Sequence, residues 1–109
     1  MPNPNEVTVS QVNGQWQCSP DPIVPTGLNA IIKFTLATGG YAFRATNAIV
    51  VQSPGTQFPD PSETKDATTA KLKDRNDERG QFKYSVFLTQ DGTGSTVEID
   101  PIINNDERP

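Results

Sequence analysis

Residues 80 to 89, Gly-Gln-Phe-Lys-Tyr-Ser-Val-Phe-Leu-Thr, constrain the fold more than any other part of the sequence. After the glycine, large apolar side chains recur at every second position, at Phe82, Tyr84, Val86 and Leu88. Side chains of a strand point alternately to opposite faces. This period of two therefore predicts a β-strand with one face on a core and the other toward water.

The same alternation recurs around an Asn-Gly pair at 13–14, which suits a two-residue type I′ turn between two strands. A loop of that length places Gln11 opposite Trp16 and Val9 opposite Cys18. The apolar residues of both strands then share one face, so the turn and the pattern predict the same hairpin. Cys18 is expected to be buried as a small apolar residue rather than exposed as a reactive thiol.

Further alternating segments predict strands at 29–36, 41–44, 48–52 and 96–100, and residues 101–104 are expected to extend past a bend. Residues 53–63 are expected to form a surface loop with Phe58 as its anchor. Residues 64–73 allow one short helix or, at 70–73, an edge strand whose lysines discourage aggregation. We favour the strand, because the rest of the chain is β.

Short strands at roughly ten-residue spacing with turn signals between them predict an all-β fold. We expect a Greek-key β-sandwich, cupredoxin-like or immunoglobulin-like, with about seven to eight short strands and at most one short helix near 64–73. At 109 residues the chain can bury one core but not two. We therefore expect a single domain over 1–109, with flexible tails at 1–5 and 105–109.

Composition excludes several classes of function. The absence of histidine removes Ser-His-Asp and Cys-His catalysis and imidazole-bound zinc or copper. A net charge of −4 argues against nucleic acid or an anionic membrane as partner. One cysteine allows no internal disulfide. No apolar run approaches the ~20 residues that span a bilayer, and residues 1–6 show no signal peptide, so a cytoplasmic location is the default expectation.

Two segments resemble known sandwich proteins. Residues 22–34, Pro-Ile-Val-Pro-Thr-Gly-Leu-Asn-Ala-Ile-Ile-Lys-Phe, resemble the early strands of cupredoxin-like sandwiches. Residues 80–86, with Asp-Pro-Ile-Ile-Asn at 100–104, are similar to a group of small uncharacterised bacterial proteins. The resemblance implies a fold and no activity. Blue-copper sites use two His, a Cys and usually a Met, whereas here His is absent, Met1 is the only methionine and Cys18 comes early.

Acidic segments suggest two further chemistries. Residues 74–80, Asp-Arg-Asn-Asp-Glu-Arg-Gly, place side-chain oxygens before a glycine, as a calcium loop does. The EF-hand spacing is not met, because the glycine is seventh rather than sixth and the twelfth residue is Ser85. A solvated turn is the competing interpretation. Carboxylates that could meet in a cleft and act on a sugar are Asp21, Asp60, Glu63, Asp66, Asp100 and Asp106.

Ile31 and Phe87 are apolar residues on the polar faces of their strands. If the two strands are neighbours, they form a small apolar patch beside Lys33 and Lys83. We expect no catalytic residue, metal or cofactor. The chain is predicted to be a non-enzymatic interaction module that contacts another protein, or a second copy, through this patch or the loop at 53–63. The alternative is a carboxylate-dependent carbohydrate-active domain or a calcium-binding domain.

Overall fold

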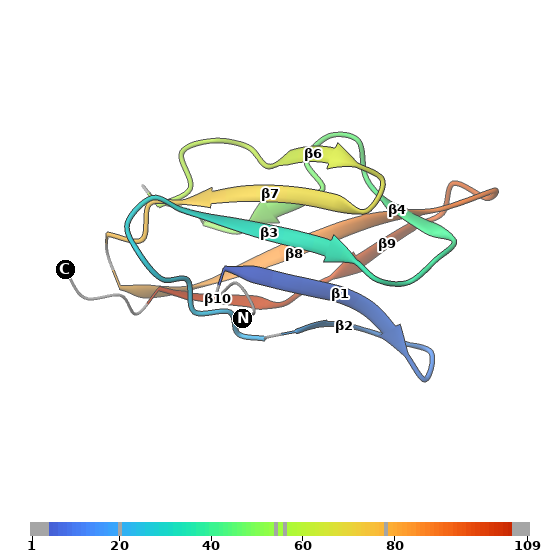
Figure 1. Ribbon diagram of the computed structural model, residues 1–109, viewed down its shortest axis with the longest axis horizontal. Coiled ribbons are helices and arrows are strands. Elements are labelled where there is room, and N and C mark those ends of the chain that lie inside the picture. Colours follow the sequence, from blue (N-terminus) through green and yellow to red (C-terminus); the bar gives the residue numbers. More distant parts are fainter. Residues whose placement is uncertain (1–4, 20, 54, 56, 78, 106–109) are drawn as a thin grey trace.

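The computed structural model describes residues 5–19, 21–53, 55, 57–77 and 79–105. These residues form two facing sheets (Figure 1) and contain no helix of the length and apolarity needed to cross a membrane. The all-β sandwich is confirmed. Its strands are β1 (Glu6–Val12), β2 (Gln15–Ser19), β3 (Ala30–Leu36), β4 (Tyr41–Phe43), β5 (Ile49–Val51), β6 (Glu63–Asp66), β7 (Thr69–Asp74), β8 (Gly80–Gln90), β9 (Thr96–Ile99) and β10 (Ile102–Asn105).

The first sheet has the order β2-β1-β3-β7-β6, and the second is built around β8. Along β8, β9 and β10 pair with one side, and β4 and β5 pair with the other. All of these pairs are antiparallel. The stretch predicted as the main strand is therefore the centre of its sheet.

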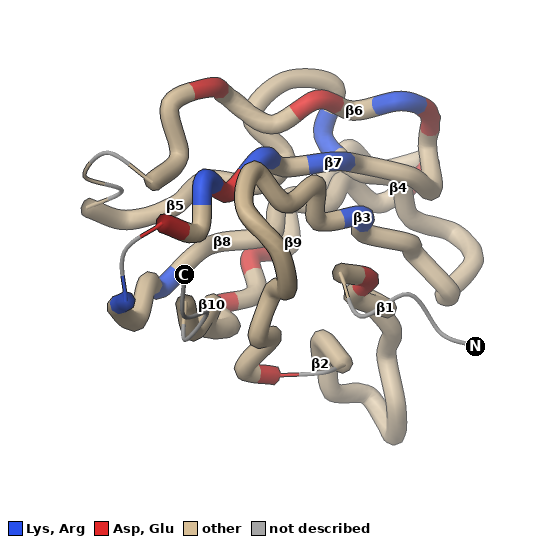
Figure 2. Tube along the Cα trace, turned by 60° about the vertical axis from the view of Figure 1, so that its left-hand side comes forward, with Lys and Arg blue, Asp and Glu red and all other residues tan. Residues whose placement is uncertain are grey.

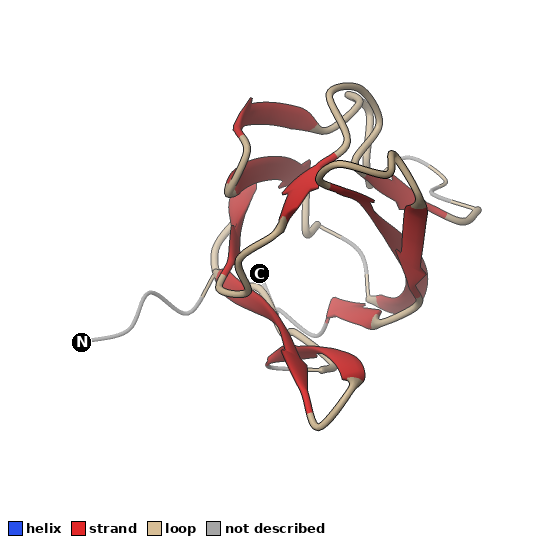
Figure 3. Ribbon diagram, turned by 90° about the vertical axis from the view of Figure 1, so that its right-hand side faces the viewer, coloured by secondary structure: helices blue, strands red, loops and turns tan. Residues whose placement is uncertain are grey.

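The core lies between the sheets, as the view along the long axis shows (Figure 3). Tyr84, Val86 and Leu88 are fully buried, which confirms the predicted inward face of β8. The Tyr84 ring lies 5.6 Å from that of Phe34 on β3, so the two aromatic rings join the sheets across the core. Phe58 is buried as predicted, and it anchors its loop by packing edge-on against a partly buried aromatic residue of β8.

The N-terminal hairpin has the predicted register, with Val9 opposite Cys18. Its turn residues, Asn13 and Gly14, both have positive φ, as a type I′ turn requires. One pairing was not predicted: β1 also runs parallel to β3. The hairpin is thereby joined to the middle of the first sheet.

The strand count differs from the sequence-based expectation. The described residues contain ten strands rather than seven or eight, because residues 63–66 and 102–105 also form strands. Between β6 and β7 the Asp66 carboxylate accepts a hydrogen bond of 2.9 Å from the Thr68 backbone N–H, which closes a tight turn. The strand predicted at 70–73 is confirmed, but β6 covers its edge, so the predicted edge position was wrong.

Each of the expected flexible tails, 1–5 and 105–109, includes one residue that is held in the fold. The Asn5 side chain accepts a 2.8 Å hydrogen bond from Thr26 N and donates one of 3.2 Å to Thr26 O. Asn105 ends β10 and is buried. Both residues belong to the sandwich, and residues 1–4 and 106–109 lie outside the described residues.

Candidate functional site

The predicted patch of Ile31, Lys33, Lys83 and Phe87 is not formed. β3 pairs with β1 on one side and β7 on the other, so it has no free side for β8, which lies in the second sheet. Ile31 and Lys33 therefore belong to one sheet, and Lys83 and Phe87 to the other. Phe87 is only half-exposed, because the guanidinium carbon of Arg44 lies 4.0 Å from its ring centroid.

Ile31 contributes instead to a groove of about 330 Å³, which we call the lysine groove. Ile31 is 47% exposed. The groove lies where the outer face of β3, β7 and β6 meets the end of the loop before β6. The sheet face and the loop, which were predicted as separate contact regions, thus meet at one place. The other lining residues are Asp60, Pro61, Glu63, Lys65, Lys71 and Lys73.

Strand register explains why the lysines gather there. Lys73 lies directly opposite Ile31, and Lys71 lies opposite Lys33. Directly opposed residues of neighbouring strands share a face, and on β7 the lysines alternate with the buried residues Ala70 and Leu72. Figure 2 shows the basic positions on β3, β7 and β6. Apart from Lys83, every lysine of the chain lies on this outer face.

The charge of the groove is only partly compensated. Lys65 Nζ lies 3.0 Å from the Glu63 carboxylate, and Lys33 Nζ lies 3.9 Å from that of Glu6. Lys71 and Lys73 form no ion pair with any described carboxylate. A chain whose net charge is −4 therefore carries a local basic surface around an exposed isoleucine.

The candidate acidic residues that the structure describes do not gather into one cleft. Asp60 and Glu63 line the lysine groove, and Asp66 holds the β6–β7 turn. The Ser85 hydroxyl lies 3.0 Å from Asp100 and 2.9 Å from Glu98, a residue that sequence reasoning did not single out. Asp21 accepts a hydrogen bond from Ile102 N, and Asp106 lies outside the described residues.

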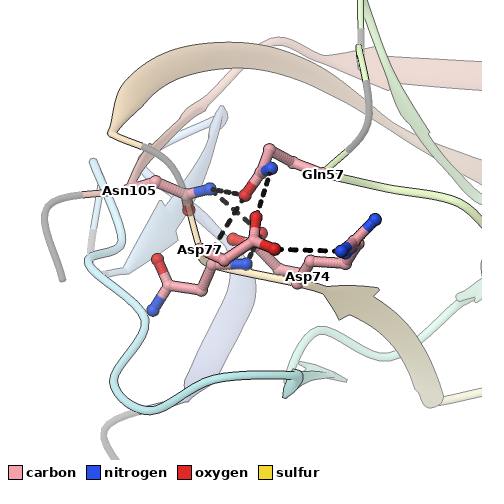
Figure 4. Close-up of polar contacts among 6 residues, drawn as sticks. Gln57, Asp74, Asp77 and Asn105 are labelled. Carbon is pink, nitrogen blue, oxygen red and sulfur yellow. Dashed lines mark hydrogen bonds and ion pairs between the residues drawn. The ribbon is translucent and has the colours of Figure 1, made fainter. Parts of the chain in front are cut away.

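The segment predicted as a calcium loop or solvated turn begins in a buried polar cluster. Asp74 Oδ1 accepts hydrogen bonds from Asn105 Nδ2 (3.0 Å) and Asn76 N (2.9 Å). Gln57 Nε2 donates to Asp77 Oδ1 at 2.7 Å, and Gln57 Oε1 lies 3.4 Å from Asn105 Nδ2 (Figure 4). Burial raises the pKa of Asp74, and the hydrogen bonds from Asn105 and Asn76 oppose that shift. The hydrogen bond from Gln57 lowers the pKa of Asp77.

Cys18 is buried as predicted, and burial raises the pKa of its thiol to about 12. Only the thiolate reacts with disulfide reagents, and at pH 8 about one thiol in ten thousand would then be ionised. We expect native protein not to react with a chromogenic disulfide at pH 8 in the time that urea-unfolded protein reacts completely. Rapid labelling of the native protein would contradict this placement.

No family model matches the chain, and no curated protein shows significant similarity to it.

Proposed function

We propose that this protein is a non-enzymatic interaction module that binds an acidic, partly apolar segment of another protein in the lysine groove. The observation that carries the proposal is Ile31, 47% exposed beside Lys71 and Lys73, which form no ion pair with a described carboxylate. An apolar centre with a polar, solvent-accessible rim is the usual composition of a protein interface.

Charge complementarity supports an acidic partner. Lys71 and Lys73 offer ammonium groups to carboxylates on a partner, and Ile31 offers apolar area between them. Opposite charge speeds encounter and fixes register more than it adds affinity. Binding should therefore be of moderate affinity and should weaken with salt.

We also propose that the sandwich is cupredoxin-like rather than immunoglobulin-like. The parallel pairing of β1 with β3 supports this choice, since immunoglobulin sheets are antiparallel. The copper function is not part of the proposal, because the sequence contains no histidine.

The binding proposal is tested by fluorescence anisotropy with a labelled peptide of alternating glutamate and leucine. The variant Lys71→Glu/Lys73→Glu is expected to bind at least about tenfold more weakly than wild type, a loss of about 1.4 kcal/mol. Lys83→Glu, on the other sheet, is the charge control, and it changes the net charge half as much as the double variant does. If only net charge mattered, Lys83→Glu would lose about half the binding free energy that the double variant loses.

The apolar contribution has its own matched pair. Ile31→Ser should weaken peptide binding, whereas Val50→Ser should not, although Val50 is 39% exposed on the second sheet. Light scattering after size exclusion tests whether a second copy of this chain, rather than a foreign segment, occupies the lysine groove. A wild-type dimer that Lys71→Glu/Lys73→Glu separates would make the partner a second copy and overturn the choice of a foreign segment.

A further inference from the structure

Three buried oxygen atoms in the polar cluster have no hydrogen-bond partner within the described part of the chain. They are Asp74 Oδ2, Asn76 Oδ1 and Asn105 Oδ1. Their residues are 0%, 1% and 1% exposed, respectively. A buried polar atom without a partner costs free energy, so three acceptors in one cluster call for a positively charged or proton-donating group.

The orientation of the two amides is determined by their neighbours. Asn76 Nδ2 donates to the backbone oxygens of Pro25 and Gly27, each at 3.1 Å. Asn105 Nδ2 donates to Asp74 Oδ1. Turning either amide over would place its oxygen against other acceptors. Both unpartnered atoms are therefore oxygens.

We propose that Asp74, Asn76 and Asn105 bind a hard, oxygen-preferring metal cation, for which sodium and calcium are the two candidates. One carboxylate and two amide oxygens are ligand types that calcium accepts. Figure 4 shows Asp74 and Asn105 on neighbouring segments with their side chains directed toward one another. Among the described residues no three His, Cys, Asp or Glu side chains form a metal site, so this one depends on its amides.

The charge around the cluster supports a cation. Asp74 is fully buried, and the nearby charge of Asp77 is offset by Arg75, whose guanidinium lies 3.0 Å from it. The formal charge of Asp74, Arg75 and Asp77 together is −1. A bound cation would neutralise the buried carboxylate and tie the end of β7 to the end of β10. The three ligands do not line the lysine groove, so this inference does not depend on the proposed function.

Thermal unfolding of metal-depleted protein tests the proposal, with ionic strength held constant by choline chloride. Calcium or sodium should raise the melting temperature by about 5 °C through mass action, and whichever does so identifies the cation. Magnesium should do little, because it dehydrates reluctantly and demands octahedral geometry. An unchanged melting temperature in all three salts overturns the proposal.

Variants locate the effect. Asp74→Asn should abolish the cation-dependent rise, whereas Asp66→Asn, at an exposed turn, should keep it. Asn105→Asp adds a carboxylate, so it should melt lower without the cation and show a larger rise with it. If Asp74→Asn does not fold, titration calorimetry with the cation compares its binding to wild type and to Asn105→Asp, and this comparison tests the assignment instead. Loss of the rise in Asp66→Asn, or a rise of wild-type size in Asn105→Asp, overturns the assignment.

Discussion

Replacing Phe34 with alanine will destabilise the domain by about 4 kcal/mol, as measured by urea unfolding. Phe34 is fully buried on β3, and its ring contacts Tyr84 of the opposite sheet. Truncation removes apolar contact and leaves a cavity between the sheets, and small domains have only about 5–15 kcal/mol of stability to lose. The variant should therefore unfold at a markedly lower urea concentration than wild type.

Thr35→Ala is the matched control for this prediction. Thr35 is the next residue of the same strand, but its side chain lies on the outer, half-exposed face. Its replacement should change stability by no more than about 0.5 kcal/mol. Similar losses in the two variants would mean that β3 does not present Phe34 to the core.

Asn105→Ala, measured without added metal salts, will lower the free energy of unfolding by about 3 kcal/mol. The change removes the amide N–H group that donates to Asp74 Oδ1 at 3.0 Å. Asp74 Oδ1 then loses this donor. Among the described residues, the hydrogen bond that it still accepts comes from Asn76 N. Loss of a partner by a buried charged group is among the costlier single changes.

Asn104→Ala is its control, since Asn104 precedes Asn105 in β10 and is only half-buried. Its backbone N–H donates to Ile23 O at 2.8 Å, and this bond does not involve the side chain that the substitution removes, so the strand should remain paired. We expect a loss below about 0.5 kcal/mol. Equal costs at 104 and 105 would assign the effect to the strand rather than to the cluster.

Local pattern predicted the parts of the fold that depend on neighbouring residues. The hairpin at 13–14 followed from turn chemistry and alternation, which agreed on one register. The inward face of β8 followed from its period of two. Both signals lie within one or two strands, where side-chain geometry leaves few alternatives.

The missed features depend on which strands become neighbours. Nothing in the alternation of β3 indicates that β1 will pair with it in parallel and β7 on its other side. The prediction of a patch formed by Ile31 and Phe87 was wrong for that reason. Ile31 was correctly predicted to be exposed, but its surroundings came from β6 and β7.

The polar cluster was missed for a related reason. Its members come from a loop, a strand end and a segment that was predicted to be a tail, at Gln57, Asp74 and Asn105. Polar residues at such places are usually solvated. Only the folded chain brings them together, since the hydrogen bonds of Asn105 span 48 and 31 residues.

Backbone amide shifts in an NMR titration with the glutamate-leucine peptide would show where a partner binds. Binding in the lysine groove predicts the largest shifts at Ile31, Lys71 and Lys73, and their loss in Lys71→Glu/Lys73→Glu. Largest shifts around Val50 and Phe87, on the outer face of the second sheet, would contradict the proposed function. The absence of any saturable shift at low salt would contradict it equally.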